Sequence, residues 1–349
     1  PPTELSSKTT RALQLNLLWH LQADAGVFTR ENSRGIVFHS LHIDHDDSED
    51  RFVRLPEIYA HRRPAISVEF FPPKTPAGEA LLAQRLERFR ALDPAFCSIT
   101  YGAGGSTREK TLEWARRLRN EYGFETMCHL TCVGHSREEL RSLLEGLWAD
   151  AIENIIALRG DPPRGQENWQ PHPEGLRHAV ELVRLARSVA PFGIAVAGFP
   201  EGHPESPTEQ EDLRYLKEKV DAGADVVITQ LFFDNTDFFH YVNAARAVGV
   251  SVPIVPGIMP FRTVAQLEKF TTVYARTRNG PARIPEKLRK RLQGIASDED
   301  AARLGIAYAI EQCEELLDRG VPGIHFYCLN ESDAVDAILQ SLRSSHRLA

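Results

Sequence analysis

Residues 65–76 read A-I-S-V-E-F-F-P-P-K-T-P, a short apolar run that ends at two prolines. Runs of β-branched and aromatic residues of this length are typical of a buried strand. The run also contains a carboxylate, Glu69, among apolar neighbours. A buried ionised carboxylate is costly unless it is paired, neutralised or used in function. The stretch therefore predicts a core strand and marks Glu69 as a candidate functional residue.

Seven similar runs follow along the chain, and longer amphipathic stretches separate them. The runs begin near residues 96, 126, 154, 193, 226, 253 and 323. One intervening stretch begins with Ser136 and Glu139, which have the spacing of a helix capping box. Eight strand–helix units predict an α/β fold, a (β/α)8 TIM barrel, with a doubly wound sheet as the alternative. The segment from about residue 276 to residue 320 is longer than one crossover needs, which predicts extra helices before the last strand.

The first 60 residues differ from the rest. They include the polar, acidic stretch H-S-L-H-I-D-H-D-D-S-E-D at 39–50. This composition predicts a largely disordered or irregular N-terminal extension over residues 1–60, with one short amphipathic helix starting near Arg11. Residues 61–349 are then expected to form the barrel domain.

Composition favours a cytoplasmic enzyme. The chain has 349 residues, 42% of them hydrophobic, and a net charge of −7, with no dense Lys/Arg cluster of the kind that binds nucleic acid. No apolar run approaches the roughly 18 residues of a membrane span, and the N-terminus lacks the order of a signal peptide. Five cysteines without framework spacing predict free thiols in a reducing compartment.

The segment T-M-C-H-L-T-C brings Cys128, His129 and Cys132 close together in the sequence, which suggests a metal site. On a strand, however, four residues separate the two sulfur atoms by about 13 Å, too far to share one zinc ion. We therefore expect no metal and interpret the cysteines as buried thiols.

Polar residues recur where the predicted strands end, which is where the active sites of such barrels lie. They are Glu69, Thr100, Tyr101, His129, Thr131, Arg159, Gly160, Asp161, His203, Gln230, Tyr327 and Asn330. Each alone is compatible with a helix cap or a turn, but together they favour a shared cavity. The chain has no G-x-G-x-x-G, P-loop or G-x-S-x-G motif. Glu69 and Asp161 leave open a flavin-free (β/α)8 hydrolase or lyase. A glycosidase would be expected to have more than the four tryptophans present, for sugar stacking.

The order of short motifs along the barrel resembles the methylenetetrahydrofolate reductase family. The motifs are S-V-E-F-F-P-P-K, S-I-T-Y-G-A, H-L-T-C, A-L-R-G-D, F-P-E-G-H-P-E, D-A-G-A-D, I-T-Q-L-F-F, V-P-G-I-M-P and H-F-Y-C-L-N, between residues 67 and 330. Each is weak alone, but their order on consecutive units is specific. The resemblance implies a bacterial-type single-domain flavoprotein that reduces methylenetetrahydrofolate to methyltetrahydrofolate and so supplies methyl groups for methionine synthesis.

The resemblance also implies FAD as bound cofactor, NADH or NADPH as hydride donor, and ping-pong exchange of the nicotinamide and folate substrates. Glu69 is then the general acid that protonates the folate's leaving nitrogen, and we expect its apolar neighbours Val68, Phe70 and Phe71 to raise its pKa. Asp161 lies beside the flavin. The implied FAD-binding residues are Thr100, Tyr101, Ala103, His129, Arg159, Gly160, Asp161, His178, Ala179, Phe199, His203, Asp212, Tyr215 and Lys219. The implied substrate-binding residues are Glu69, Thr100, Asp161, Gln230, Gln266 and Phe270.

One position departs from the family pattern. Glu331 follows H-F-Y-C-L-N where the family usually has a basic residue that helps to hold folate. Either another base, such as Arg262, compensates or folate affinity is weakened. A third hypothesis is therefore a non-catalytic relative that binds flavin or folate. The family is usually oligomeric, so we expect a homo-oligomer. Because the chain stops soon after the last unit, we expect no C-terminal regulatory domain.

Overall fold

The computed structural model describes residues 53–62, 64–102, 108–161, 170 and 172–348. Residues 51–349 form one compact unit. Residues 1–52 of the extension predicted over residues 1–60 lie outside the described residues, as do the short helix expected near Arg11 and Ala103.

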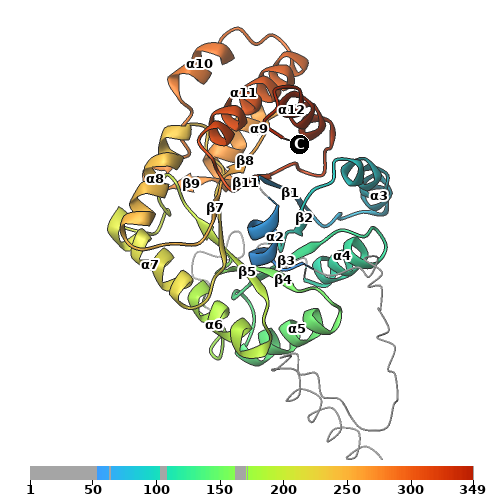
Figure 1. The fold of residues 1–349 in the computed structure, drawn as a ribbon, viewed down its shortest axis with the longest axis vertical. Helices are drawn as coiled ribbons and strands as arrows, with labels where there is room; N and C mark the ends of the chain where they lie inside the picture. Colours follow the sequence, from blue (N-terminus) through green and yellow to red (C-terminus); the bar gives the residue numbers. More distant parts are fainter. Residues whose placement is uncertain (1–52, 63, 103–107, 162–169, 171, 349) are drawn as a thin grey trace, which may run out of the picture. The chain divides into compact units, whose positions relative to one another are not determined.

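The core of this unit is a sheet of parallel strands that closes into a barrel (Figure 1). The strands are β1 (Ala65–Phe70), β2 (Phe96–Ile99), β3 (Thr126–Thr131), β4 (Asn154–Leu158), β5 (Gly193–Gly198), β6 (Val226–Thr229), β7 (Ile254–Val255), β8 (Gly257–Ile258) and β11 (Gly323–Phe326). Only Pro256 separates β7, which pairs with β6, from β8, which pairs with β11. These two short strands are therefore one barrel position, and the predicted eight-unit barrel is confirmed.

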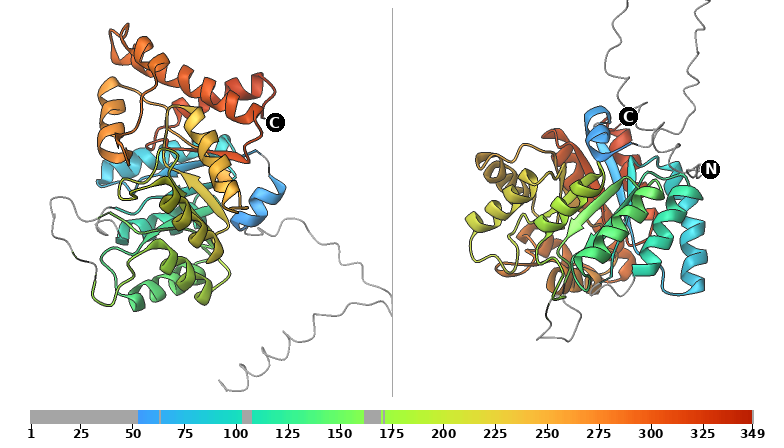
Figure 2. Two further views of the ribbon diagram at one scale, coloured as in Figure 1. Left: turned by 90° about the vertical axis from the view of Figure 1, so that its left-hand side faces the viewer. Right: turned by 90° about the horizontal axis from the view of Figure 1, so that it is seen from below.

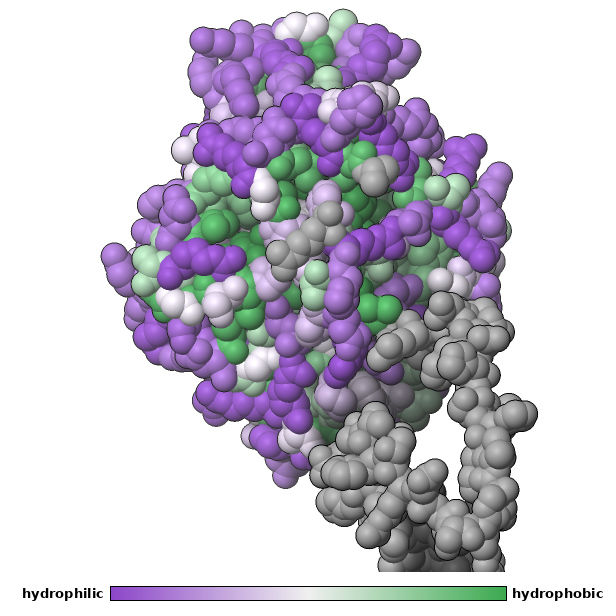
Figure 3. Space-filling view, in the orientation of Figure 1, coloured by the Kyte–Doolittle hydropathy of each residue, from purple (hydrophilic) through white to green (hydrophobic). Residues whose placement is uncertain are grey.

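Helices surround the strands in Figure 1. Those that follow the successive strands are α3 (Pro76–Ala91), α4 (Arg108–Asn120), α5 (Arg137–Ala149), α6 (Ala179–Val189), α7 (Glu209–Asp221), α8 (Asn235–Ala247) and α12 (Asp333–Ser344). The capping box predicted for α5 is present, because Ser136 Oγ accepts from the Glu139 amide and Glu139 Oε2 accepts from the Ser136 amide. Apolar faces of the helices pack on the outer side of the strands. Hydrophilic residues cover much of the outer helices in Figure 3. No helix in the described ranges is long and apolar enough to cross a membrane.

The predicted additional helices before the last strand are also present. This segment contains α9 (Val264–Lys269), the π-helix η2 (Phe270–Tyr274), the hairpin of β9 (Arg276–Thr277) and β10 (Gly280–Pro281), α10 (Glu286–Leu292) and α11 (Asp298–Asp318). A separate apolar cluster, which includes Phe233, Phe261 and Tyr308, holds it against the barrel.

The N-terminal end of the barrel is closed by α2 (Leu55–His61), which lies at one end of the strands in Figure 2. Leu55, Ile58 and Tyr59 are buried and cluster with inward-facing strand residues such as Phe96. The Leu55 amide donates to Oδ1 of the fully buried Asn154 at 2.8 Å. The expected domain boundary at residue 60 is therefore misplaced, because the ordered barrel unit already includes α2.

Candidate active site

Glu69 lies inside the barrel, near the carboxyl end of β1. Successive side chains of a strand point to opposite faces. Val68 and Phe70 accordingly point outward into the cluster between strands and helices, whereas Ser67 and Glu69 contact residues of the barrel interior. Only 7% of Glu69 is exposed. The strand thus places one buried carboxylate in the core of the barrel.

Two histidines face this carboxylate from other strands. Oε2 of Glu69 lies 3.3 Å from Nε2 of His129 on β3 and 3.8 Å from Nε2 of His325 on β11. The other ring nitrogen of His325, Nδ1, lies 2.8 Å from the Ser67 hydroxyl. His129 is a predicted site residue, but His325 is not. Its inward position in the run G-I-H-F, two residues before Tyr327, is the sequence signal that could have identified it.

The expected rise in the pKa of Glu69 is wrong for this structure. Burial raises the pKa. The hydrogen bonds to His129 and His325 and the charge of these residues together outweigh burial and bring the pKa of Glu69 down to about 2. The apolar neighbours do not surround the carboxyl group, because Val68 and Phe70 point away from it and Phe71 is 38% exposed. Glu69 is therefore held as a carboxylate by its imidazole partners.

The interior around Glu69 contains polar atoms that no protein group satisfies. Ser98 Oγ and Thr131 Oγ1 are buried and have no hydrogen-bond partner within the described part of the chain. Ser98 pairs in register with Glu69 across β1 and β2. Buried polar groups are almost always hydrogen-bonded, so this set is suited to a polar ligand.

Other predicted residues follow neighbouring strands and have protein partners. Tyr101 is buried, and its hydroxyl lies 2.9 Å from Nε2 of His135. The Thr100 amide donates to Phe70 O. The Tyr327 hydroxyl donates to Thr229 O at 2.6 Å.

The loop after β4 carries three predicted residues. Arg159 forms a two-pronged ion pair with Glu205, rather than the pair with Asp161 that an ordinary loop would suggest. Gly160 has φ +85°, and a Cβ there would lie 2.9 Å from Thr131 Cβ, so the backbone approaches β3 closely. Asp161 is exposed.

The loop after β5 and the helix α7 bring together a second group. The His203 amide donates to Asp212 Oδ2 at 2.9 Å, and the rings of Phe199 and His203 meet edge to face at 4.7 Å. Lys219 Nζ donates to Ala197 O at 2.7 Å, and burial lowers the pKa of Lys219 to about 8 although Asp212 raises it. Three other predicted residues are partly or largely exposed: His178, Ala179 and Tyr215.

The predicted folate residues after β6 and β8 lie around the π-helix η2. Gln230 Nε2 donates to Tyr274 O at 3.4 Å. The rings of Phe270 and Tyr274 lie 5.0 Å apart, and Tyr274 is 41% exposed. Gln266 is one turn away, and its Oε1 accepts from the Arg262 amide at 2.7 Å. Tyr274 is not a sequence candidate, since the π-helical turn that places it over Phe270 is not visible in the residue pattern.

Glu331, the departure from the family pattern, is neutralised by two arginines. Its oxygens lie 2.7 Å from Arg85 Nη2 and 2.9 Å from Arg262 Nη1. The group of three charges carries a net charge of +1. The base proposed to compensate, Arg262, is thus in direct contact with Glu331.

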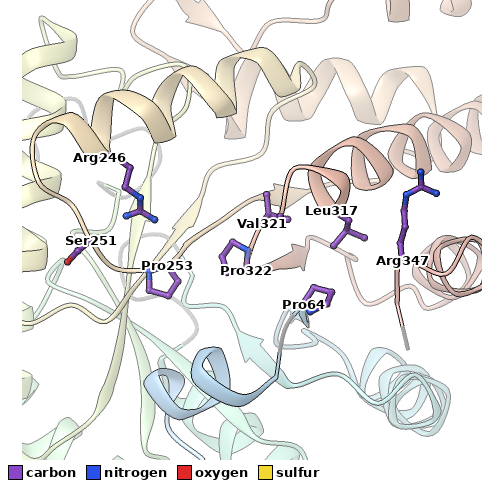
Figure 4. Close-up of a pocket in the computed structure, with 9 residues that line it drawn as sticks. Pro64, Arg246, Ser251, Pro253, Leu317, Val321, Pro322 and Arg347 are labelled. Atoms are coloured by element: carbon purple, nitrogen blue, oxygen red, sulfur yellow. The ribbon is translucent and has the colours of Figure 1, made fainter.

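A cavity of about 470 Å³ lies at the opposite end of the barrel (Figure 4). Pro64, Pro253 and Pro322 line it, and each precedes a strand. It therefore lies at the amino ends of the strands and is not part of the Glu69 site.

The metal interpretation of Cys128, His129 and Cys132 fails on geometry. Cys128 and Cys132 pack in the outer cluster, whereas His129 points inward.

The chain is similar to known proteins of one family. The family model described as Methylenetetrahydrofolate reductase matches residues 54–343. Methylenetetrahydrofolate reductase (NADH) 1 of Arabidopsis thaliana is 41% identical over 290 residues, which are 80% of this chain and 48% of the plant protein. The 5,10-methylenetetrahydrofolate reductase of Escherichia coli is 37% identical over 278 residues, which are 79% of this chain and 90% of that protein.

A solved structure has the same fold at low identity. It is an uncharacterized protein from Clostridium thermocellum that binds two copies of 5-methyl-5,6,7,8-tetrahydrofolic acid, with a TM-score of 0.54 and 16% identity, covering 84% of this chain and 99% of that one. The chain spans about half the length of the plant relatives it matches. With the family model matching most of its length, the chain belongs to the methylenetetrahydrofolate reductase family.

Proposed function

We propose that this protein reduces methylenetetrahydrofolate to methyltetrahydrofolate, using bound FAD and a reduced nicotinamide in a ping-pong hydride transfer. The observation that carries the proposal is the buried Glu69 with His129 and His325 inside a barrel of this family. The names of the plant relatives favour NADH as the donor. Synthesis of methyltetrahydrofolate would supply methyl groups for methionine.

The residues present fit a flavin. The unsatisfied hydroxyls of Ser98 and Thr131 provide donors and acceptors for a polar ring. The close approach of Gly160 to β3 leaves the backbone free of a side chain at the end of β4. Arg159, His203, Asp212 and Lys219 would hold the remainder of the cofactor. When bound, the flavin accepts a hydride from the nicotinamide and later gives it to the folate.

The protein's own contribution is to bind the substrate and to move a proton. The folate's five-membered ring must open before its carbon accepts a hydride, and ring opening requires a proton on the leaving nitrogen. Glu69 delivers this proton in our proposal. Asp161 provides negative charge near the cation that ring opening creates on the substrate.

The low pKa of Glu69 bears on when this residue can carry the proton. A carboxylate with a pKa of about 2 does not itself carry a proton at neutral pH. In our proposal Glu69 therefore takes up the proton only in the substrate complex. Substrate binding would displace water from Glu69 and favour the neutral, protonated form of its carboxyl group.

An anaerobic absorbance experiment tests the proposal. We expect the purified protein to carry a flavin band that NADH or NADPH bleaches and that methylenetetrahydrofolate restores. A band that bleaches and never returns would favour a folate-blind relative. A colourless protein that FAD does not reconstitute would contradict the flavoenzyme and favour the hydrolase alternative.

A further inference from the structure

The β9–β10 hairpin contacts the loop of residues 199–206, although the two segments are far apart in the sequence. Arg278 lies at the hairpin tip, in the two-residue turn between Thr277 and Gly280, which pair with each other. The Arg278 amide donates to Gly202 O at 3.1 Å. Its Nε donates to Ser206 O at 2.8 Å. One arginine thus bonds to both halves of the loop.

The packing of Arg278 on this loop is close. Gly202 has φ +82°, and a Cβ at Gly202 would lie 2.8 Å from Arg278 Cζ. The guanidinium therefore covers the one residue of the loop that must lack a side chain. Arg278 Nη2 is buried and lies 3.6 Å from Asp212 Oδ2. Asp212 Oδ2 also accepts from the His203 amide, so Arg278 and His203 both contact the same carboxylate.

A second contact holds the same loop through Arg283, which follows β10. The Arg283 amide donates to Glu201 Oε2 at 2.8 Å. The Arg283 guanidinium is held by Asp234 at 3.0 Å and by Asp237 at 2.7 Å. The hairpin and the residues just after it thus contact the loop through Arg278 and Arg283, and the loop contacts them at residues 201, 202 and 206.

This loop positions three of the residues expected to hold the flavin. It contains Phe199 and His203, and its Glu205 forms the two-pronged ion pair with Arg159. Displacement of the loop would therefore move contacts on both sides of the proposed cofactor site. The hairpin itself contributes none of these contacts.

We propose that Arg278 is a positioning residue, through which the β9–β10 hairpin clamps loop 199–206 and presets the flavin-binding residues. This inference rests on the proposed flavin function for its effect on affinity. The clamp itself can be tested without flavin. If the loop must be ordered when the cofactor binds, the cost lowers affinity without changing the contacts made.

The test compares Arg278→Ala and Arg278→Lys with Arg276→Ala, a matched change at an exposed position of the same hairpin. Alanine keeps the amide bond to Gly202 but loses the Nε bond to Ser206 O and the ion pair with Asp212. This loss should raise the Kd for FAD about tenfold or more in Arg278→Ala. Lysine should restore part of the affinity, and Arg276→Ala should bind as the wild type does. The Kd is read from quenching of flavin fluorescence.

Hydrogen exchange on the flavin-free proteins provides the second readout. In Arg278→Ala the amides of residues 199–206 should exchange faster, while those of the barrel strands should not change. A general loss of stability would instead accelerate exchange throughout the barrel, and that result would contradict the clamp. Unchanged exchange in the loop of Arg278→Ala would also contradict it. Failure of the wild type to bind FAD would contradict the flavin function, and the exchange data would still decide the clamp.

Discussion

At the scale of single residues, the site is defined by a carboxylate that the fold can bury only because two imidazoles face it. Removing a charged group from water is costly, and a partner at 3.3 Å offsets that cost. The same pairing holds the pKa of Glu69 at about 2. Glu69 thus depends on His129 and His325 for its burial as a carboxylate.

We expect Glu69→Gln to reduce the folate half-reaction by at least about 100-fold, since general acid catalysis contributes a factor of this order. Reduction of the flavin by the nicotinamide needs no such proton and should stay within about twofold. Stopped-flow absorbance measures both rates. Glu145→Gln, an exposed change on α5, serves as the control. Equal loss in both half-reactions would contradict the assignment.

The pKa of Glu201 is raised, whereas that of Glu69 is lowered, so the stability of the fold should depend on pH in the opposite direction through Glu201. Burial raises its pKa to about 7 although the Arg283 amide lowers it, and its Oε1 is buried without a hydrogen-bond partner among the described residues. Because the folded protein keeps this proton to a higher pH than the unfolded chain, the group stabilises the fold at low pH. That contribution is lost as pH rises from about 4.5 to about 7.

Urea unfolding of Glu201→Gln at several pH values tests this sign. Wild type should lose stability relative to the variant between pH 5 and pH 7.5, since glutamine does not titrate. Parallel pH profiles for the two proteins would show that Glu201 titrates normally.

At the scale of elements, the turn after β11 makes contacts with the end of β1, with helix α3 and with the residue pair before α9. Leu329 and Asn330 have φ values of +53° and +61°, and the Asn330 side chain bonds to both backbone groups of Phe71. This geometry directs Glu331 toward Arg85 and Arg262. The turn therefore places a charge group of net +1 near the ends of β1 and β11.

We expect Glu331→Gln to lower the KM for methylenetetrahydrofolate about two- to fivefold, because it raises the local charge by one and a partly exposed charge contributes little more. The effect should decrease with added salt, and flavin reduction should not change. Glu87→Gln, an exposed change on the same helix as Arg85, is the control. A raised KM would mean that Glu331 acts mainly by holding Arg262 in place.

At the scale of the whole barrel unit, two features close the barrel. One is the strand position shared by β7 and β8, and the other is the helix α2 at the amino end. Asn154 links α2 to β4 because its Oδ1 accepts from the Leu55 amide and its Nδ2 donates to Val53 O and Glu125 Oε1.

Asn154→Ala should lower the free energy of unfolding by about 2–4 kcal/mol, since it leaves the buried Leu55 amide without an acceptor. Chemical denaturation measures the change. Asn120→Ala, at the exposed end of α4, should alter stability by no more than about 0.5 kcal/mol. Similar effects of the two substitutions would show that α2 is only loosely attached.

The sequence by itself determined the order of the elements, the barrel class and the strand ends where the site lies. These follow from local patterns, because apolar runs bounded by Pro or Gly form strands and amphipathic runs cover them. Glu69 and His129 were identifiable for the same reason, as polar residues in otherwise apolar strands.

Only the tertiary structure decided which way Glu69 faces, that His325 shares it with His129, and that its pKa falls rather than rises. It alone placed α2 in the barrel and the hairpin on loop 199–206. These outcomes depend on contacts between residues far apart in the chain. Such contacts are set by strand register and packing, which no local pattern encodes.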